Sequence, residues 1–90
     1  MSLYPIGTVV KIKDLPMEIL ITGYYPQDPE EKRQIYDYMG ISAVVGLTFS
    51  TTAMFFDQDA IEEVLFCGYQ DEEMDNYLNE INKLRLEFKV

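Results

Sequence analysis

The sequence predicts a small α+β domain: a strongly bent antiparallel sheet, or a partly open SH3-like barrel, of about five strands with one C-terminal helix. Short apolar runs separated by turn residues fill residues 8–69, as is typical of short strands. From residue 71 apolar side chains recur every three or four positions, which indicates an amphipathic helix. A chain of 90 residues is expected to form a single domain over residues 1–90 with a small core.

The first two strands are predicted at residues 8–13 and 17–25. Val10 and Ile12 alternate with two lysines in the first, which is the period of a half-buried strand. Residues 19–21 are apolar on both faces, so the second strand is expected at the centre of the sheet. Because only a short turn separates them, the two strands are expected to be antiparallel neighbours.

The middle of the chain predicts a loop, a strand, a second loop and another strand. Residues 26–34 hold two prolines and a mixed-charge run, which exclude a central strand. A third strand is expected at 35–41. Residues 42–52 are rich in small and hydroxyl side chains, and we interpret them as a long loop whose conformation the pattern leaves open. A short strand is expected at 53–56.

The acidic stretch that follows predicts one helical turn, with Asp57 or Asp59 as N-cap. Asp59 and Glu62 stand at capping-box spacing. Residues 64–69 then predict a buried strand, in which Cys67 is interpreted as a small core residue.

The C-terminal helix is predicted to begin at Gln70 or Asp71, and its acidic start and basic end suit the helix dipole. We expect it to continue to about Leu86 and to end in a frayed tail. Because residues 84–90 alternate strictly, a strand is the alternative there. The apolar stripe of the helix consists of Met74, Tyr77, Leu78, Ile81 and Leu84.

The composition narrows the class of function. A net charge of −9 repels nucleic-acid backbones and anionic membranes, so neither is an expected partner. One cysteine allows no intramolecular disulfide, which fits the cytoplasm, and no transmembrane or signal segment is predicted. The absence of histidine removes the commonest general base and metal ligand, so the sequence argues against an enzyme and predicts no cofactor.

Two acidic clusters and the cysteine were weighed as chemical sites. Asp57, Asp59, Glu62 and Glu63 lack the glycine of a calcium loop, and helix capping explains them better. The acids at 71–75 suit the start of a helix better than a sugar-cleaving pair. A nucleophilic cysteine is disfavoured because no histidine can activate it. No metal site or catalytic residue is predicted.

Four tyrosines form the candidate partner-binding site: Tyr24, Tyr25, Tyr36 and Tyr38. Neighbouring strands would bring some of these rings to one surface, where tyrosine beside acid can dock a peptide. The alternative is that tyrosine is simply a good strand former with its hydroxyl at the rim.

Residues 3–10, 19–23, 35–38, 56–66 and 68–73 occur in an order that resembles one bacterial family, domain of unknown function family 4176. The resemblance covers roughly residues 3–80, and residues 41–52 depart from the family's Pro- and Gly-containing loop. It implies a small cytoplasmic accessory protein of Gram-positive bacteria, encoded beside type VII secretion components and LXG-type toxins. It implies no catalytic residues.

The sequence and this resemblance together predict a non-catalytic protein-interaction module, an adaptor or chaperone for a type VII secretion substrate or toxin. An immunity protein that neutralises a toxin is one alternative, and a small-ligand-binding regulator is another. An exposed strand edge or the tail at 84–90 leaves a homodimer open.

Overall fold

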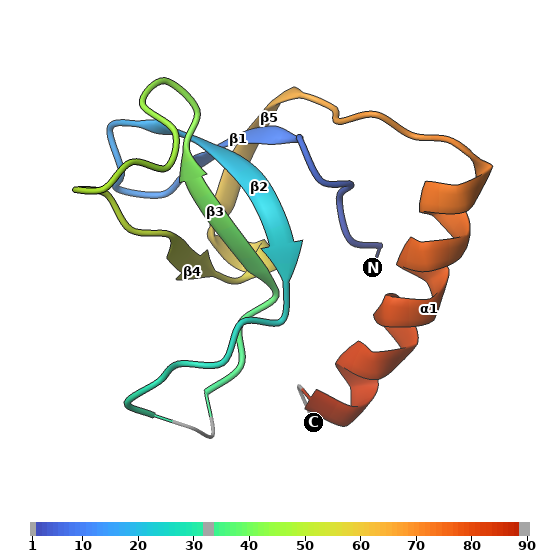
Figure 1. Cartoon of the computed structure of the whole chain (residues 1–90). Helices are drawn as coiled ribbons and strands as arrows, with labels where there is room; N and C mark the ends of the chain where they lie inside the picture. The colour runs from blue at the N-terminus through green and yellow to red at the C-terminus, as the bar shows by residue number, and fades with distance from the viewer. Residues whose placement is uncertain (1, 32–33, 89–90) are drawn as a thin grey trace.

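The computed structural model describes residues 2–31 and 34–88 of the chain (Figure 1). Along these residues a five-stranded sheet is followed by one long helix. The strands are β1 (Val9–Ile12), β2 (Glu18–Tyr24), β3 (Tyr38–Ser42), β4 (Met54–Phe56) and β5 (Ile61–Phe66), and the helices are the 3₁₀ turn η1 (Gln58–Ala60) and α1 (Glu72–Phe88).

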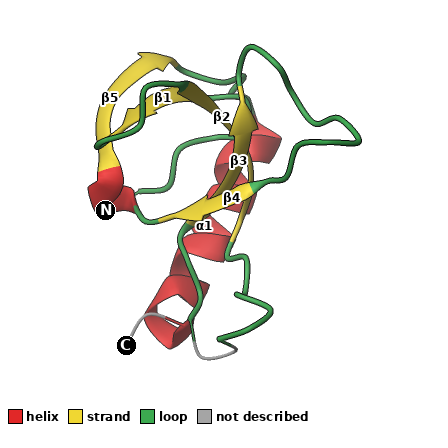
Figure 2. Cartoon of the chain, turned by 90° about the vertical axis from the view of Figure 1, so that its left-hand side faces the viewer, coloured by secondary structure: helices red, strands yellow, loops and turns green. Residues whose placement is uncertain are grey.

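The sheet has the strand order β4-β3-β2-β1-β5, and every pair is antiparallel. The first three strands each pair with the next along the chain, whereas β5 returns to pair with β1. Figure 2 shows that the sheet curls, and that η1 connects its two edge strands. This confirms the predicted α+β class and the bent, open antiparallel sheet with a C-terminal helix.

The core lies between the curved sheet and α1. β1 and β2 contribute Val10, Ile12, Ile19 and Ile21, all of them buried. As predicted, β2 is the central strand, because it stands third in the five-stranded order. Tyr38, Phe56, Leu3, Leu78 and Ile81 complete the same cluster. Burial of these apolar side chains is the main favourable term in folding.

The helix begins where the sequence predicts. The Met74 N–H donates to the carboxylate of Asp71 at 2.8 Å, so Asp71 caps α1. The helix continues through residues 84–88, which excludes a strand there, while Lys89 and Val90 lie outside the described residues. Leu78 and Ile81 face the core, and the N-terminal segment runs between the sheet and α1 (Figure 1).

Two strand boundaries differ from the prediction. β3 begins at Tyr38 rather than at residue 35, because Tyr25 takes a left-handed φ of 54° that ends β2 early. β5 covers Ile61–Phe66 rather than 64–69, and it is exposed rather than buried. The reason is its position: β5 is an edge strand, paired with β1 alone through two register shifts, and only Ile61 at its start packs against the core.

Two local interpretations are also wrong. The predicted helical turn does exist, as η1, with Asp57 at its N-cap position, although the Asp57 side chain makes no capping bond. The capping box of Asp59 and Glu62 is wrong, because Glu62 belongs to β5. Cys67 is exposed instead of buried, because β5 ends at Phe66. Residues 43–52 do form the predicted loop before β4.

Candidate interaction surface

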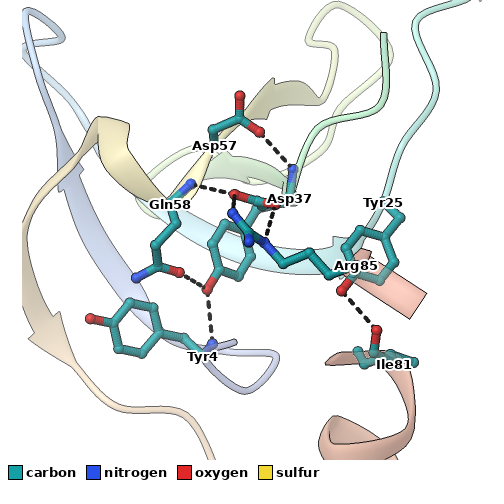
Figure 3. Close-up of polar contacts among 8 residues, drawn as sticks. Tyr4, Tyr25, Asp37, Asp57, Gln58, Ile81 and Arg85 are labelled. Atoms are coloured by element: carbon teal, nitrogen blue, oxygen red, sulfur yellow. Dashed lines mark hydrogen bonds and ion pairs between the residues drawn. The ribbon is translucent and has the colours of Figure 1, made fainter. Parts of the chain in front are cut away.

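The best-connected polar group of the described chain is Asp37, which is fully buried just before β3. Its carboxylate accepts the guanidinium of Arg85 through Nε at 2.9 Å and Nη2 at 3.3 Å. It also accepts the Gln58 N–H at 2.8 Å, and its own N–H donates to Asp57 at 3.0 Å (Figure 3). One side chain therefore ties β3, η1 and α1 together.

The bond to Asp37 raises the pKa of Arg85 above its ordinary value. A paired carboxylate whose oxygens already accept three hydrogen bonds is a structural group and not an available base. The ion pair between Asp37 and Arg85 was not predicted from the sequence, because residues so far apart along the chain carry no local signal of pairing.

Two of the four predicted tyrosines pack inside the domain. Tyr38 is fully buried, and its hydroxyl donates to Gln58 and accepts the Tyr4 N–H at 2.9 Å. The Tyr24 hydroxyl donates to the Tyr4 carbonyl at 2.5 Å. Burial raises the pKa of both phenols well above their usual range. The Tyr38 ring is thus inaccessible to a partner, whereas Tyr24 lies at the edge of the core.

The other two tyrosines point to different places. The Tyr25 hydroxyl donates to the Ile81 carbonyl at 2.8 Å, which attaches the end of β2 to α1 (Figure 3). Tyr36 packs on Phe55 of β4, with ring centroids 5.9 Å apart. The four tyrosines therefore do not form one open surface, and partner binding through them stays a prediction.

An exposed aromatic surface does occur at the start of α1. Tyr69, Asp71, Glu73, Met74 and Tyr77 line a groove of about 340 Å³, which we call the α1 groove. Tyr69 is 75% exposed and Tyr77 is 50% exposed. The ring centroids of Tyr77 and Tyr24 are 6.3 Å apart, so Tyr77 packs against the partly buried Tyr24 of β2.

Sequence reasoning missed the α1 groove. It assigned Tyr77 to the buried stripe of the helix and Tyr69 to a buried strand. The usable signal was Tyr69 directly before the acidic helix start, because a ring next to carboxylates suits a cationic or amphipathic segment. The groove offers aromatic faces, a thioether and two carboxylates, which can bind a partner segment. These groups do not include a nucleophile paired with a general base.

Within residues 2–31 and 34–88, no group of three or more Cys, Asp or Glu side chains could hold a metal ion. The same residues include no helix long and apolar enough to cross a membrane.

The curved sheet, η1 and the attached helix define a small α+β domain in which the buried carboxylate of Asp37 serves internal contacts. A family model described as Domain of unknown function (DUF4176) matches residues 3–77. The chain therefore belongs to this family, which confirms the resemblance noted from the sequence. Comparison with curated proteins and with solved structures found no match.

Proposed function

We propose that this protein is a non-catalytic protein-interaction module that acts in the cytoplasm as an adaptor or chaperone for a type VII secretion substrate or toxin. One observation supports the proposal that the protein binds another protein: the α1 groove is lined by two tyrosines and a methionine beside two carboxylates. Tyrosine is enriched at the energetic centres of protein interfaces. The secretion part rests on the context that the family resemblance implies.

The groove defines the chemistry of the expected partner segment. Asp71 and Glu73 lie on a chain of net charge −9, so they favour a lysine or arginine. The same cation can stack on a tyrosine face, and Met74 accommodates apolar neighbours. We therefore expect a segment in which basic and apolar side chains alternate or share one helix face.

A non-catalytic role agrees with how the polar residues are used. The chain contains no histidine, and the buried carboxylate of Asp37 is bonded to Arg85 and Gln58. The tyrosine hydroxyls of Tyr24, Tyr25 and Tyr38 each donate to another part of the fold. Internal contacts thus explain these groups without a reaction.

The test is direct binding to the proteins encoded beside this chain's gene. Each is co-expressed with the tagged wild type or with a Tyr69→Ala/Tyr77→Ala double variant, and affinities are then measured by calorimetry. We expect one secreted substrate or toxin to bind, and the double variant to bind at least about tenfold more weakly. Circular dichroism checks that the variant folds.

The matched control is Phe49→Ala, which removes an exposed ring from the loop at 43–52, outside α1. It should leave the affinity unchanged. A partner that binds the double variant as tightly as the wild type excludes the α1 groove as its site. If none of the neighbouring products binds, the adaptor proposal is wrong.

The net charge of −9 favours one second candidate, an immunity protein that covers the basic active site of a toxin. Such a complex should weaken steeply with salt and abolish toxin activity. An adaptor complex should tolerate salt better and leave the toxin active. Measuring toxin activity in the purified complex therefore separates the two candidates.

A further inference from the structure

One long stretch of the chain carries no charge. Although 26% of the residues are charged, none lies between Asp37 and Asp57 in the sequence. This stretch contains β3, the loop at 43–52 and β4, and the loop projects from the side of the sheet away from α1 (Figures 1 and 2). A chain of net charge −9 thus keeps this segment neutral, and Glu18 of β2 is the charged residue whose carbonyl accepts the Ala43 N–H at its border.

The loop at 43–52 is held from within by hydroxyl groups. The Ser42 hydroxyl accepts the N–H groups of Val44 at 3.3 Å and Val45 at 3.1 Å. Thr51 accepts the Thr48 N–H at 2.7 Å and donates to the Gly46 carbonyl at 3.2 Å. Short polar side chains thus satisfy the backbone of the loop locally, and its large apolar side chains are not needed for that and project into solvent.

Four large apolar side chains project from this loop. Phe49 is fully exposed, and Val44, Leu47 and Val45 are 86%, 67% and 58% exposed. Single exposed apolar residues are ordinary, but four on one ordered loop form a continuous apolar projection that marks an interaction site.

A groove lies beside this projection. Its volume is about 420 Å³, and no charged residue lines it. A cavity of about 150 Å³ is large enough to bind benzene, so this groove accommodates a phenyl ring. It is lined by Met17, Ile19, Ile41, Ser42, Val45, Ser50, Thr51, Thr52, Ala53 and Met54.

We propose that the occupant of this groove is Phe49 of a second copy of this chain, so that two copies exchange their loops in a symmetric dimer. The exposed ring belongs to the same loop that lines part of the uncharged groove, which is the self-complementarity that a two-fold interface requires. The proposal is independent of the α1 groove.

Charge argues for a second copy and against an ionic partner. Two molecules of net charge −9 repel each other, and an interface formed by residues 38–56 and their groove contributes no carboxylate of its own to that repulsion. The remaining repulsion acts at a distance and is screened by salt. The dimer should therefore tighten as salt rises, whereas a complex with a basic partner should weaken.

The test is sedimentation equilibrium from about 5 to 500 µM protein at low and high salt. We expect a monomer–dimer equilibrium that shifts toward dimer in high salt. Phe49→Ala should weaken dimerisation about tenfold to a hundredfold, because it removes a large buried apolar surface from each side. Tyr69→Ala, which removes an exposed ring outside the loop, should leave it unchanged.

A mixing experiment tests the reciprocal geometry. Met17, which lines the groove and is 45% exposed, is changed to Glu to block the groove without removing the ring. Each variant alone lacks both intact contacts. A mixture of Phe49→Ala and Met17→Glu regains one, from the unchanged ring to the unchanged groove, so it should dimerise more tightly than either variant alone.

Three outcomes would overturn the proposal. They are a wild type that stays monomeric at every salt concentration, a Phe49→Ala variant that dimerises like the wild type, and a mixture no tighter than its components. Wild-type monomer that floats with neutral phosphatidylcholine vesicles would instead assign the loop to a lipid surface. None of these results bears on binding at the α1 groove, so the two proposals fail separately.

Discussion

Tyr38 shows how one residue can be misassigned from sequence and still be central to the fold. Its ring lies within 6.3 Å of Tyr4 and 5.5 Å of Phe56, centroid to centroid, and its hydroxyl is bonded on both sides. The sequence predicted Tyr38 in a strand and counted it among the candidate partner-binding tyrosines. Asp37 beside it is buried as well, since Arg85 from the distant helix neutralises its charge. A residue's own strand cannot predict such a partner.

The buried tyrosines predict alkaline sensitivity. Burial raises the pKa values of Tyr24, Tyr25 and Tyr38 above the ordinary value of 10.0. Their stabilising effect is complete below that value and is lost as pH rises past it, because only the unfolded chain ionises readily. We expect the free energy of unfolding in urea to fall above about pH 10, by up to about 1.4 kcal/mol per pH unit for the fully buried Tyr38.

Tyr24→Phe provides the control for this prediction, because it keeps the ring and removes one ionisable group. Its stability should depend less steeply on pH than that of the wild type. An equal slope in both proteins would show that the phenol of Tyr24 is not linked to folding.

Among the elements, β5 illustrates why an apolar run does not by itself establish burial. Val64, Leu65 and Phe66 were predicted in the interior, yet all three are exposed. Whether a strand lies at the edge or at the centre depends on the topology of the whole sheet, and a short apolar run in the sequence does not determine that topology. The two register shifts lie in the pairing of β5 with β1, and irregularities of this kind twist an edge strand, which is a recognised way to discourage strand-to-strand aggregation.

The exit from β5 depends on Gly68. A Cβ atom there would lie 2.3 Å from the Ile6 carbonyl oxygen and 2.9 Å from the Thr8 nitrogen. The Gly68 N–H also donates to the buried Thr8 hydroxyl at 3.0 Å. Because the neighbours are backbone atoms and cannot move cheaply, Gly68→Ala should reduce the free energy of unfolding by about 2–4 kcal/mol, measured in urea.

Gly23→Ala is the matched control within β2. Its added Cβ would meet only the flexible end of Met39, at 3.5 Å, an ordinary contact. We expect a change within about 1 kcal/mol in either direction. Equal losses from the two substitutions would contradict the close approach at Gly68.

For the whole molecule, the sequence predicted the fold class better than it predicted which side chains are exposed. Strand periodicity and the helical stripe follow from side chains that must reach one core, so local patterns report them well. Which rings stay outside depends on how the sheet curls and where α1 attaches. Hence Tyr69 and Phe49, neither of them among the predicted site residues, are fully or largely exposed, while Tyr38 is buried.

The attachment of α1 yields the last prediction. Polar contacts from Arg85 and the Ile81 carbonyl supplement the apolar contacts of Leu78 and Ile81. Arg85→Met leaves the Asp37 carboxylate buried without its cation, and release of the helix would return that carboxylate to water. We therefore expect the opening free energy measured by hydrogen exchange to fall by about 2–4 kcal/mol for the amides of α1, and by less for those of β2.

The control is Lys83→Met, on the exposed face of the same helix, which should change this opening free energy by less than about 0.5 kcal/mol. If Arg85→Met lowers the protection of β2 and α1 amides from exchange by the same amount, the helix and the sheet open as one unit and α1 is not separately released.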